Sequence, residues 1–174
     1  MKIGKQGLAL IKLFEGLDLK AYMPTPNDRP TIGYGHTKGV KMGMKISRER
    51  ADALLVEDLA WVEAVIAKKV TVSLTQPQYD ALCSFIYNVG AGAFSKSTLL
   101  RRLNEGNYVA AANQLPRWNK QKKMVLNGLT RRRAAEKALF LSEPLAPTKV
   151  AKKPTGGLLE ALMAFFVSIT KGRG

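Results

Sequence analysis

The stretch EGLDLKAYMPTPNDRPTIGYGHT, residues 15–37, decides the fold that we expect for this chain. It joins the end of an apolar helix to a loop with three prolines and to a short extended run, TIGYG, that ends beside the only histidine. Proline excludes a helix from the loop, and the glycines of the run allow another segment or a ligand to approach the backbone. The sequence therefore predicts a small β-hairpin lobe directly after an N-terminal helix.

The helix before this lobe is predicted over residues 4–16, and Glu15 lies in its last turn. A helix C-terminus carries partial negative charge, which disfavours a carboxylate. If the side chain also faces apolar surface, its protonated form is favoured, as a general acid requires. A solvated glutamate at a helix end fits the same pattern, and periodicity alone favours that second interpretation.

The segments after the hairpin predict a long connection to a helical lobe. Alternating apolar and lysine positions in KGVKMGMKIS, residues 38–47, indicate a third, exposed strand. Ser47 is a good N-cap for one long helix that runs to about Lys69. Such a helix would join the β lobe to the rest of the chain.

A buried central helix is predicted from Thr75 onward. Thr75 can cap it, Pro77 suits its first turn, and Gln78 completes a capping box. Shorter helices follow, and Thr130 is the predicted N-cap of the last one. With helices dominating the latter two thirds, the expected fold class is α+β.

The charge of the chain is its most unusual property. Twenty-eight Lys and Arg residues against 13 Asp and Glu give a net charge of +15, which indicates a polyanionic partner. Nucleic acid, anionic lipid, lipopolysaccharide and an acidic cell wall all fit this charge. Nucleic acid is the least favoured, because the basic residues are dispersed and no recognised nucleic-acid-binding motif is present.

Cysteine and histidine are too few for several common kinds of site. Cys83 is the only cysteine, so no intrachain disulfide can form, and without a Cys/His cluster we expect no metal site and no cofactor. Cys83 lies in the apolar run ALCSFIY, which predicts a buried thiol and not a nucleophile. The N-terminal segment is interrupted by Lys12 and Glu15, so it does not resemble a signal peptide, and we expect synthesis in a cytoplasm.

The predicted domain organisation has three parts. Residues 1–143 form the globular domain, residues 144–157 form a linker rich in Pro, Lys and Gly, and residues 158–174 form a cationic amphipathic helix. The run LLEALMAFFVSIT is shorter than the roughly 20 residues of a transmembrane helix. It suits a helix that lies on an anionic membrane, although a terminal helix docked on the domain fits as well.

Two separated motifs resemble one known family. EGLDLKAY with TIGYGHT, and then residues 76–120 with GLTRRRAAEKALFL, resemble the phage-type lysozymes, the muramidase endolysins of glycoside hydrolase family 24. The resemblance covers residues 5–142 and not the tail. It implies a lysozyme-like fold with a cleft between two lobes, and cleavage of peptidoglycan between N-acetylmuramic acid and N-acetylglucosamine. By match of motif, it makes Glu15 the catalytic glutamate and Thr31 a second catalytic residue.

The chain departs from the family pattern between these two residues. Members of the family usually carry an aspartate nine residues after the glutamate, and here that position is Pro24. Asp28 in the same loop is the best candidate for the missing carboxylate, and Asp18 is the second. A site in which Thr31 and water act without a second carboxylate remains a third possibility. The resemblance points to an inverting reaction, with Glu15 as acid and Asp28 and Thr31 around the attacking water.

Several further residues are candidates for substrate binding. The resemblance places Asn88 at the cleft, where it would bind an N-acetyl or peptide group or cap its helix. One of Arg131–Arg133 is expected to reach Glu15 or the glycan. The cluster does not say which arginine turns inward, and Arg131 is named among the substrate-binding candidates. His36 would bind within the site or orient its loop. Three aromatic residues are candidates for stacking on sugars: Tyr22, Tyr34 and Trp118.

The leading functional hypothesis is a monomeric endolysin that lyses the host cell. Such a protein would wait in the host cytoplasm until a holin opens the inner membrane, and would then reach the cell wall. An alternative is a membrane-permeabilising protein that acts partly without hydrolysis through residues 158–174. A lytic transglycosylase, which also uses a lone glutamate, is the third hypothesis.

Overall fold

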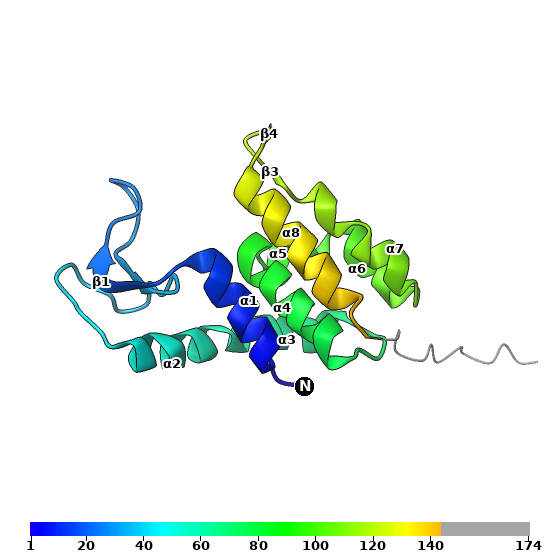
Figure 1. Ribbon diagram of the computed structural model, residues 1–174, viewed down its shortest axis with the longest axis horizontal. Helices are drawn as coiled ribbons and strands as arrows, with labels where there is room; N and C mark the ends of the chain where they lie inside the picture. Colours follow the sequence, from blue (N-terminus) through cyan, green and yellow to red (C-terminus); the bar gives the residue numbers. More distant parts are fainter. Residues whose placement is uncertain (144–174) are drawn as a thin grey trace, which may run out of the picture.

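The computed structural model describes residues 1–143. A small lobe that contains the first two strands lies at one end of the molecule, a larger group of helices lies at the other, and the first two helices run between them (Figure 1). The elements in chain order are α1 Lys5–Glu15, β1 Asp18–Tyr22, β2 Thr31–Gly33, α2 Arg48–Asp58, α3 Ala60–Lys69, α4 Gln76–Val89, α5 Ala91–Ser95, α6 Thr98–Asn104, α7 Tyr108–Ala112, η1 Leu115–Arg117, β3 Lys120–Gln121, β4 Met124–Val125 and α8 Asn127–Phe140. The linker and C-terminal helix predicted for residues 144–174 lie outside the described residues.

The small lobe is built on the predicted hairpin. Strands β1 and β2 pair in antiparallel fashion, with Asp18 opposite Gly33 and Tyr22 opposite Thr31, and the register shifts between these pairs. The loop between the strands holds the three prolines, which cannot donate to a ladder. The prediction of a β-hairpin after α1 is confirmed.

The third strand predicted over residues 38–47 is wrong. This segment forms turns, and an isolated bridge between Lys45 and Lys20 joins it to β1. Gly39 and Gly43 both have positive φ, at 73° and 88°, and reverse the chain within a few residues. The alternation of apolar and lysine residues therefore reflects a folded loop.

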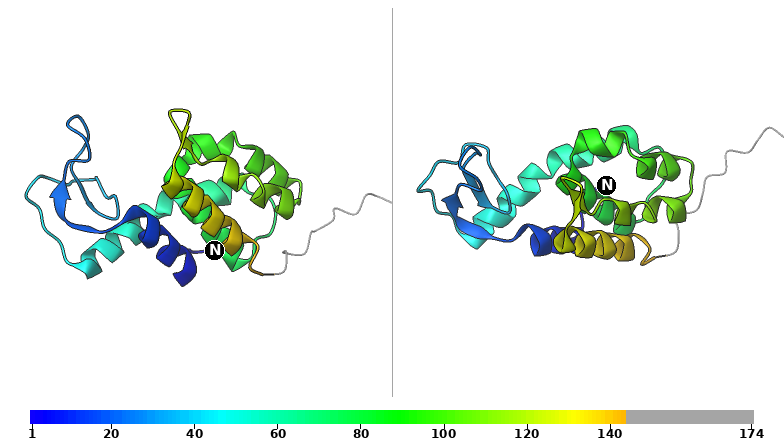
Figure 2. Two further views of the ribbon diagram at one scale, coloured as in Figure 1. Left: turned by 45° about the horizontal axis from the view of Figure 1, so that its top comes forward. Right: turned by 90° about the horizontal axis from the view of Figure 1, so that it is seen from above.

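The connection between the lobes consists of two helices where one was predicted. Ser47 caps α2 as expected, because its hydroxyl accepts a hydrogen bond from the backbone N–H of Arg50 at 3.2 Å. The connection is divided at Leu59, which lies between the end of α2 and the start of α3. The N–H of Leu59 still donates to the backbone oxygen of Leu55 at 3.0 Å. The extent of the connection was predicted correctly and its continuity was not. Figure 2 shows α2 and α3 running one after the other along one side of the molecule.

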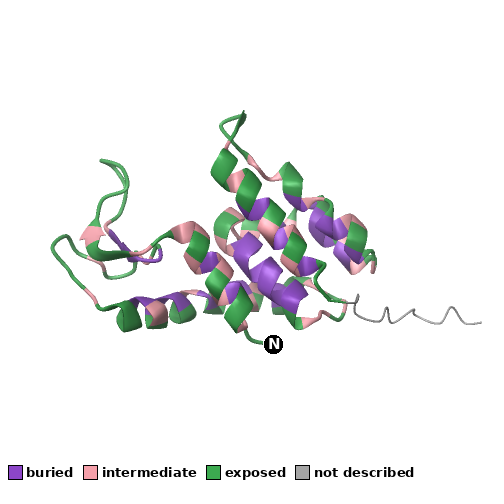
Figure 3. Ribbon diagram, viewed as in Figure 1, coloured by how far each residue is buried: buried purple, intermediate pink, exposed green. Residues whose placement is uncertain are grey.

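Helix α4 lies at the centre of the helical lobe, where most of its length is buried (Figure 3). Its capping box is present as predicted, with the Thr75 hydroxyl and the Gln78 side chain each bonded to the other residue's backbone. The helix packs against α1, α3 and α8, which explains why its sequence is apolar nearly all round. Cys83 is fully buried as expected, and burial raises the pKa of its thiol.

Helix α1 receives its N-terminal cap from α4. Gly4 has no side chain to offer, and the carboxylate of Asp80 instead accepts hydrogen bonds from the N–H groups of Gly4 at 2.8 Å and Gly7 at 3.0 Å. A Cβ atom at Gly7 would come within 2.9 Å of the Asp80 side chain. The two helices can therefore approach closely only because position 7 is glycine.

Helix α8 begins earlier than predicted. It starts at Asn127, so Thr130 lies inside the helix, where its hydroxyl donates to the oxygen of Leu126 at 3.1 Å. Thr130 is therefore not the N-cap. Within residues 1–143, no helix is both long and apolar enough to cross a membrane.

Candidate active site

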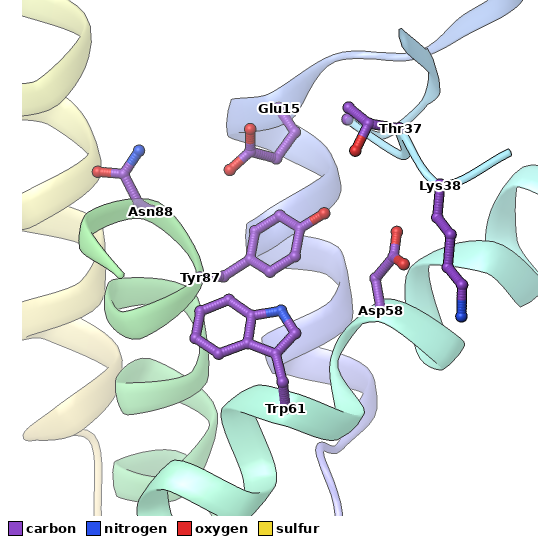
Figure 4. Close-up of a pocket in the computed structure, with 8 residues that line it drawn as sticks. Glu15, Thr37, Lys38, Asp58, Trp61, Tyr87 and Asn88 are labelled. Carbon is purple, nitrogen blue, oxygen red and sulfur yellow. The ribbon is translucent and has the colours of Figure 1, made fainter. Parts of the chain in front are cut away.

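A pocket of about 370 Å³ lies where the two lobes meet. Its walls come from the end of α1, the loop after β2, α2, α3 and the end of α4, with these residues lining it: Glu15, Gly35, Thr37, Lys38, Asp58, Trp61, Tyr87 and Asn88. Tyr87 and Trp61 lie between Asn88 on one side and Asp58 on the other (Figure 4). The pocket thus combines carboxylates, an amide and aromatic faces.

Glu15 reaches this pocket because α1 ends at the lobe boundary. Gly16 follows it with φ of 74°, which turns the chain away and leaves the last side chain of the helix facing the pocket. The Glu15 side chain is 23% exposed, and its Oε1 accepts a hydrogen bond from Nη1 of Arg132 at 2.7 Å. The glutamate is therefore both partly solvated and held by a buried cation.

Arg132 is the arginine that reaches Glu15, a choice among the three that the sequence left open. Arg131 is exposed, whereas Arg132 and Arg133 are buried. Successive side chains on an α-helix point in directions about 100° apart, so three consecutive arginines cannot all face inward. The expectation that one of the three contacts Glu15 is confirmed.

Arg132 and Arg133 belong to a buried polar cluster with Glu136. Burial raises the pKa of Glu136, and the guanidinium groups of Arg133 and Arg132 and the hydroxyl of Ser84 act against this rise. Burial also lowers the pKa of Arg133, which the carboxylate of Glu136 opposes. Each charge alone would be costly in this interior, and the close opposite charges stabilise the cluster.

The proposed second carboxylate lies outside the pocket lining. Asp28 is exposed on the loop between β1 and β2, and its Oδ1 accepts a hydrogen bond from the N–H of Arg29 at 2.9 Å. Burial raises the pKa of Tyr22, and the negative charges of Asp18, Glu15 and Asp28 raise it further. The charges of all three carboxylates therefore act on Tyr22, and both Asp28 and Asp18 stay candidates.

Thr31 begins β2 and is buried. Its hydroxyl donates to the backbone oxygen of Arg29 at 3.0 Å, and its strand partner is Tyr22. It does not line the pocket around Glu15. The assignment of Thr31 as a second catalytic residue stays a prediction.

His36 is held by the protein at both ring nitrogens. Nδ1 lies 2.8 Å from a carboxylate oxygen of Asp58, and Nε2 lies 2.8 Å from the backbone oxygen of Lys38. No ring nitrogen is left for a substrate, so the structure does not support the substrate-binding role assigned to His36. The histidine instead anchors the loop after β2 to the end of α2, which matches the loop-orienting alternative.

Tyr34 is a core residue and does not stack on sugar. Only 5% of it is exposed, and its ring faces the Lys12 ammonium at 5.5 Å. The backbone of Ile32 and His36 exchanges two hydrogen bonds of 2.9 Å, which folds the intervening residues into a tight loop against the core. Sequence alone gives no direction for a side chain in such a loop.

Asn88 lines the pocket, as expected, and also a second cavity. Its Oδ1 accepts a hydrogen bond from Nη2 of Arg133 at 3.1 Å. The second cavity, of about 400 Å³, lies between the end of α4 and the β3–β4 hairpin, and Trp118 and Lys120 line it. Trp118 packs edge-on against Phe85 with ring centroids 5.4 Å apart, so it is only partly available to a ligand.

Sequence reasoning missed the aromatic pair Trp61 and Tyr87. Trp61 is 41% exposed although it lies in a largely apolar helix, and Tyr87 precedes Asn88 on α4. A large exposed aromatic residue on a helix that leads from the β lobe was the available signal. Asp58, which lines the same pocket, was missed because its role depends on His36, 22 residues earlier.

Among residues 1–143, no three His, Cys, Asp or Glu side chains gather in a way that would hold a metal ion.

Comparisons with known sequences and with solved structures point to the same protein family. A model of the phage lysozyme family matches residues 12–136. The chain belongs to the phage lysozyme family. The endolysin of Acyrthosiphon pisum secondary endosymbiont phage 1 is 48% identical over 146 residues, which cover 82% of this chain and 99% of that protein. This phage lysozyme is accordingly an endolysin-type glycosidase, as the two motifs indicated.

Solved structures confirm the lysozyme-like α+β fold. A P22 lysozyme mutant has 46% sequence identity and a TM-score of 0.76, with coverage of 81% of this chain and 99% of that one. The muramidase domain of SpmX from Asticaccaulis excentricus has 44% identity and a TM-score of 0.77, over 82% and 99% of the two chains. The fold class predicted for this lysozyme is therefore correct.

Proposed function

We propose that this phage lysozyme hydrolyses the bond between N-acetylmuramic acid and N-acetylglucosamine in bacterial peptidoglycan, with Glu15 as the general acid. The observation that carries the proposal is the position of Glu15. Its carboxyl group lies in the pocket between the lobes, next to the aromatic wall of Trp61 and Tyr87 and 2.7 Å from Arg132. Membership of the phage lysozyme family supports peptidoglycan as the substrate.

The proposed reaction divides the work between two sides of the sugar. Glu15 gives its proton to the glycosidic oxygen as the C1–O bond breaks. A water molecule adds to C1 from the opposite face and passes its proton to the carboxylate of Asp28, with Thr31 helping to hold the water. Attack by water from the opposite face inverts the configuration at C1. Inverting enzymes leave roughly 6.5–9.5 Å between the two carboxyl groups for this water.

The acid role of Glu15 is tested with Glu15→Gln on purified peptidoglycan. Glutamine keeps the size and the hydrogen bond to Arg132 but has no proton to give, so we expect a loss of about 10²- to 10⁴-fold in rate. Glu105→Gln is the control, because Glu105 is an exposed glutamate that pairs with arginines, as Glu15 pairs with Arg132, but lies outside the pocket. Unchanged hydrolysis by Glu15→Gln would disprove the proposal.

The second carboxylate is tested with Asp28→Asn and Asp18→Asn on the same substrate. Asp28→Asn is expected to lose most of its activity, and Asp18→Asn to keep nearly all of it. The reverse result assigns the role to Asp18. Near-full activity in both variants removes a second carboxylate from the reaction.

One observation keeps a lytic transglycosylase as the second candidate: Pro24 stands where the family usually has an aspartate. A transglycosylase would close the muramic acid ring on itself, without water. Mass spectrometry of the released muropeptides separates the two reactions. Reducing ends are expected, and anhydro-muramyl ends would replace the hydrolase by the transglycosylase.

We further propose that the enzyme lyses the host after a holin releases it to the cell wall, and that residues 158–174 bind anionic membrane or lipopolysaccharide. The support is the sequence of that segment, an apolar run with one acidic residue followed by Lys171 and Arg173. The test compares the full chain with a variant truncated after Glu143. Equal hydrolysis of purified peptidoglycan, with weaker liposome leakage and weaker killing of intact Gram-negative cells, is the expected result. Equal leakage and killing would remove the membrane role.

A further inference from the structure

Glu136 is a fully buried carboxylate that the proposed reaction does not use. It lies on α8, and its Oε1 accepts hydrogen bonds from Oγ of Ser84 at 2.7 Å, Nη2 of Arg133 at 2.9 Å and Nε of Arg132 at 3.2 Å. Its Oε2 lies 2.8 Å from Nε of Arg133. Glu136 therefore supplies the negative charge that pairs with both guanidinium groups of this cluster.

Arg132 connects Glu136 to Glu15. Its Nε donates to Glu136, its Nη2 donates to the backbone oxygen of Ser84 at 3.1 Å, and its Nη1 donates to Glu15 at 2.7 Å. All three nitrogens of the guanidinium therefore have a partner, and the side chain is only 4% exposed. The hydrogen bonds to Glu136 and Ser84 therefore fix the orientation of the Arg132 guanidinium group.

This orientation limits what Arg132 can offer to Glu15. An arginine and a carboxylate commonly form two parallel hydrogen bonds, which strongly favour the ionised carboxylate. Here Nε and Nη2 face Glu136 and Ser84, and Nη1 alone is directed at Oε1 of Glu15. Glu15 is therefore held in place without being fully paired.

The charges of the cluster balance. Two guanidinium groups, Arg132 and Arg133, face two carboxylates, Glu136 and Glu15. Lys38 and Asp58 line the same pocket as Glu15 with opposite charges, and Asp18 and Asp28 act with Glu15 on Tyr22. Burial raises the pKa of Tyr22 and of Tyr87, so these phenols stay neutral. Removing the charge of Glu136 would therefore leave Glu15 as the one carboxylate of the cluster that faces Arg132 and Arg133.

We propose that Glu136 is a positioning residue for the general acid: it neutralises Arg133 and holds Nε of Arg132, so that Glu15 keeps its place in the pocket and can still regain a proton in each cycle. This inference rests on the proposed function, in which Glu15 is the acid. Loss of the Glu136 charge would leave Glu15 as a carboxylate held by surplus positive charge. Such a carboxylate would lie in the pocket but would lack the proton that the leaving oxygen needs.

The test is the pH dependence of kcat/KM on soluble, uncrosslinked glycan strands. Activity falls on the alkaline side of the profile when the acid loses its proton, so this limb reports on Glu15. In Glu136→Gln the limb is expected to move to lower pH by about one unit or more, because an unbalanced positive charge within a few ångströms has an effect of this size. At a pH above the limb, one unit corresponds to about a tenfold loss of activity.

Arg133 provides a test in the opposite direction. Arg133→Met removes one positive charge and leaves an unpaired negative one, so its alkaline limb is expected to move to higher pH. In the double variant Glu136→Gln/Arg133→Met the charges balance again, and the limb is expected to return to the position of the parent enzyme. A purely structural role for Glu136 predicts no such return, since the double variant loses more contacts than either single variant.

The chain contains a matched control for this experiment. Glu105 pairs with Arg101 and Arg102 at the same sequence spacings as Glu136 with Arg132 and Arg133, but on the exposed surface of the helical lobe. Glu105→Gln should leave the limb unmoved. Thermal melts accompany each profile, and Glu136→Asp, which keeps the charge, should retain the parent limb even if kcat falls.

The outcomes separate this inference from the proposed function. An active Glu15→Gln would disprove the proposed function itself. An inactive Glu15→Gln, together with an unmoved limb in folded Glu136→Gln, would overturn the role of Glu136 alone. If Glu136→Gln does not fold, the decision falls to Arg133→Met, and an unmoved limb in that variant rejects the inference.

Discussion

The indole of Trp61 and the phenol ring of Tyr87 stack in the wall of the pocket that holds Glu15, with ring centroids 6.4 Å apart and planes at 22°. Tyr87 is fixed from behind, because its hydroxyl donates to the backbone oxygen of Tyr34 at 3.1 Å. Trp61 is the more exposed of the two rings. A fixed and exposed aromatic face next to the proposed general acid is well suited to bind the apolar face of a sugar ring.

Replacing Trp61 should therefore weaken substrate binding more than chemistry. In Trp61→Ala we expect KM to rise about tenfold, with kcat within a few-fold of the parent enzyme, because lost stacking of about 1–2 kcal/mol affects bound substrate and transition state alike. Trp61→Phe keeps an aromatic ring, so its KM should lie between those of the parent enzyme and Trp61→Ala. Initial rates on soluble glycan strands measure both constants, and an unchanged KM in Trp61→Ala would exclude the stacking role.

The parts of the fold that the sequence predicted well depend on neighbouring residues. The capping box of Thr75 and Gln78, the cap at Ser47 and the end of the first helix near residue 16 all depend on local sequence, and each is present. The hairpin followed from the prolines between β1 and β2, which leave few conformations open. The long connection was predicted in extent, since its break at Leu59 leaves the apolar pattern intact.

The parts that were missed depend on contacts between distant residues. Arg132 was not distinguished from Arg131 because the phase of α8 against α4 decides which arginine turns inward. Tyr34 was misplaced because the loop of β2 folds its ring into the core. The family resemblance made Glu15 the catalytic candidate, but only the packed structure shows that Trp61 and Arg132 lie beside it.

The cap that α4 supplies to α1 predicts a large effect on stability. Asp80→Ala would leave the N–H groups of Gly4 and Gly7 without partners at a buried helix end, so we expect a loss of about 2–3 kcal/mol in the free energy of unfolding. Ser47→Ala, which removes a cap at a more exposed helix start, should cost only about 1 kcal/mol. Urea unfolding followed by circular dichroism gives both values. Equal losses in the two variants would contradict a special role for the cap between helices.

Asp52 predicts how stability depends on pH. The ion pair with Lys12, with an Nζ–Oδ1 distance of 2.8 Å, is the main cause that lowers the pKa of Asp52, and the Tyr34 hydroxyl adds to it. A carboxyl group whose pKa is lowered on folding stabilises the protein above its unfolded pKa of about 3.9, and this contribution is lost as pH falls through the folded value. Asp52→Asn should therefore be less stable than the parent at pH 6, and the difference should shrink below about pH 3. Lys12→Met must show the same trend, and a difference that does not depend on pH would refute this assignment.

The turn between β3 and β4 offers a site for stabilisation. Lys122 and Lys123 occupy it with φ of 46° and 69°, and the flanking residues Gln121 and Met124 are paired. A two-residue turn with positive φ at both positions strongly prefers Asn-Gly, because other side chains are strained there. Lys122→Asn/Lys123→Gly should therefore raise the free energy of unfolding by about 1 kcal/mol. Lys120→Gly, which places a glycine in β3 instead of in the turn, should lower the free energy of unfolding. If the double variant is no more stable than the parent, the turn holds no strain that Asn-Gly relieves.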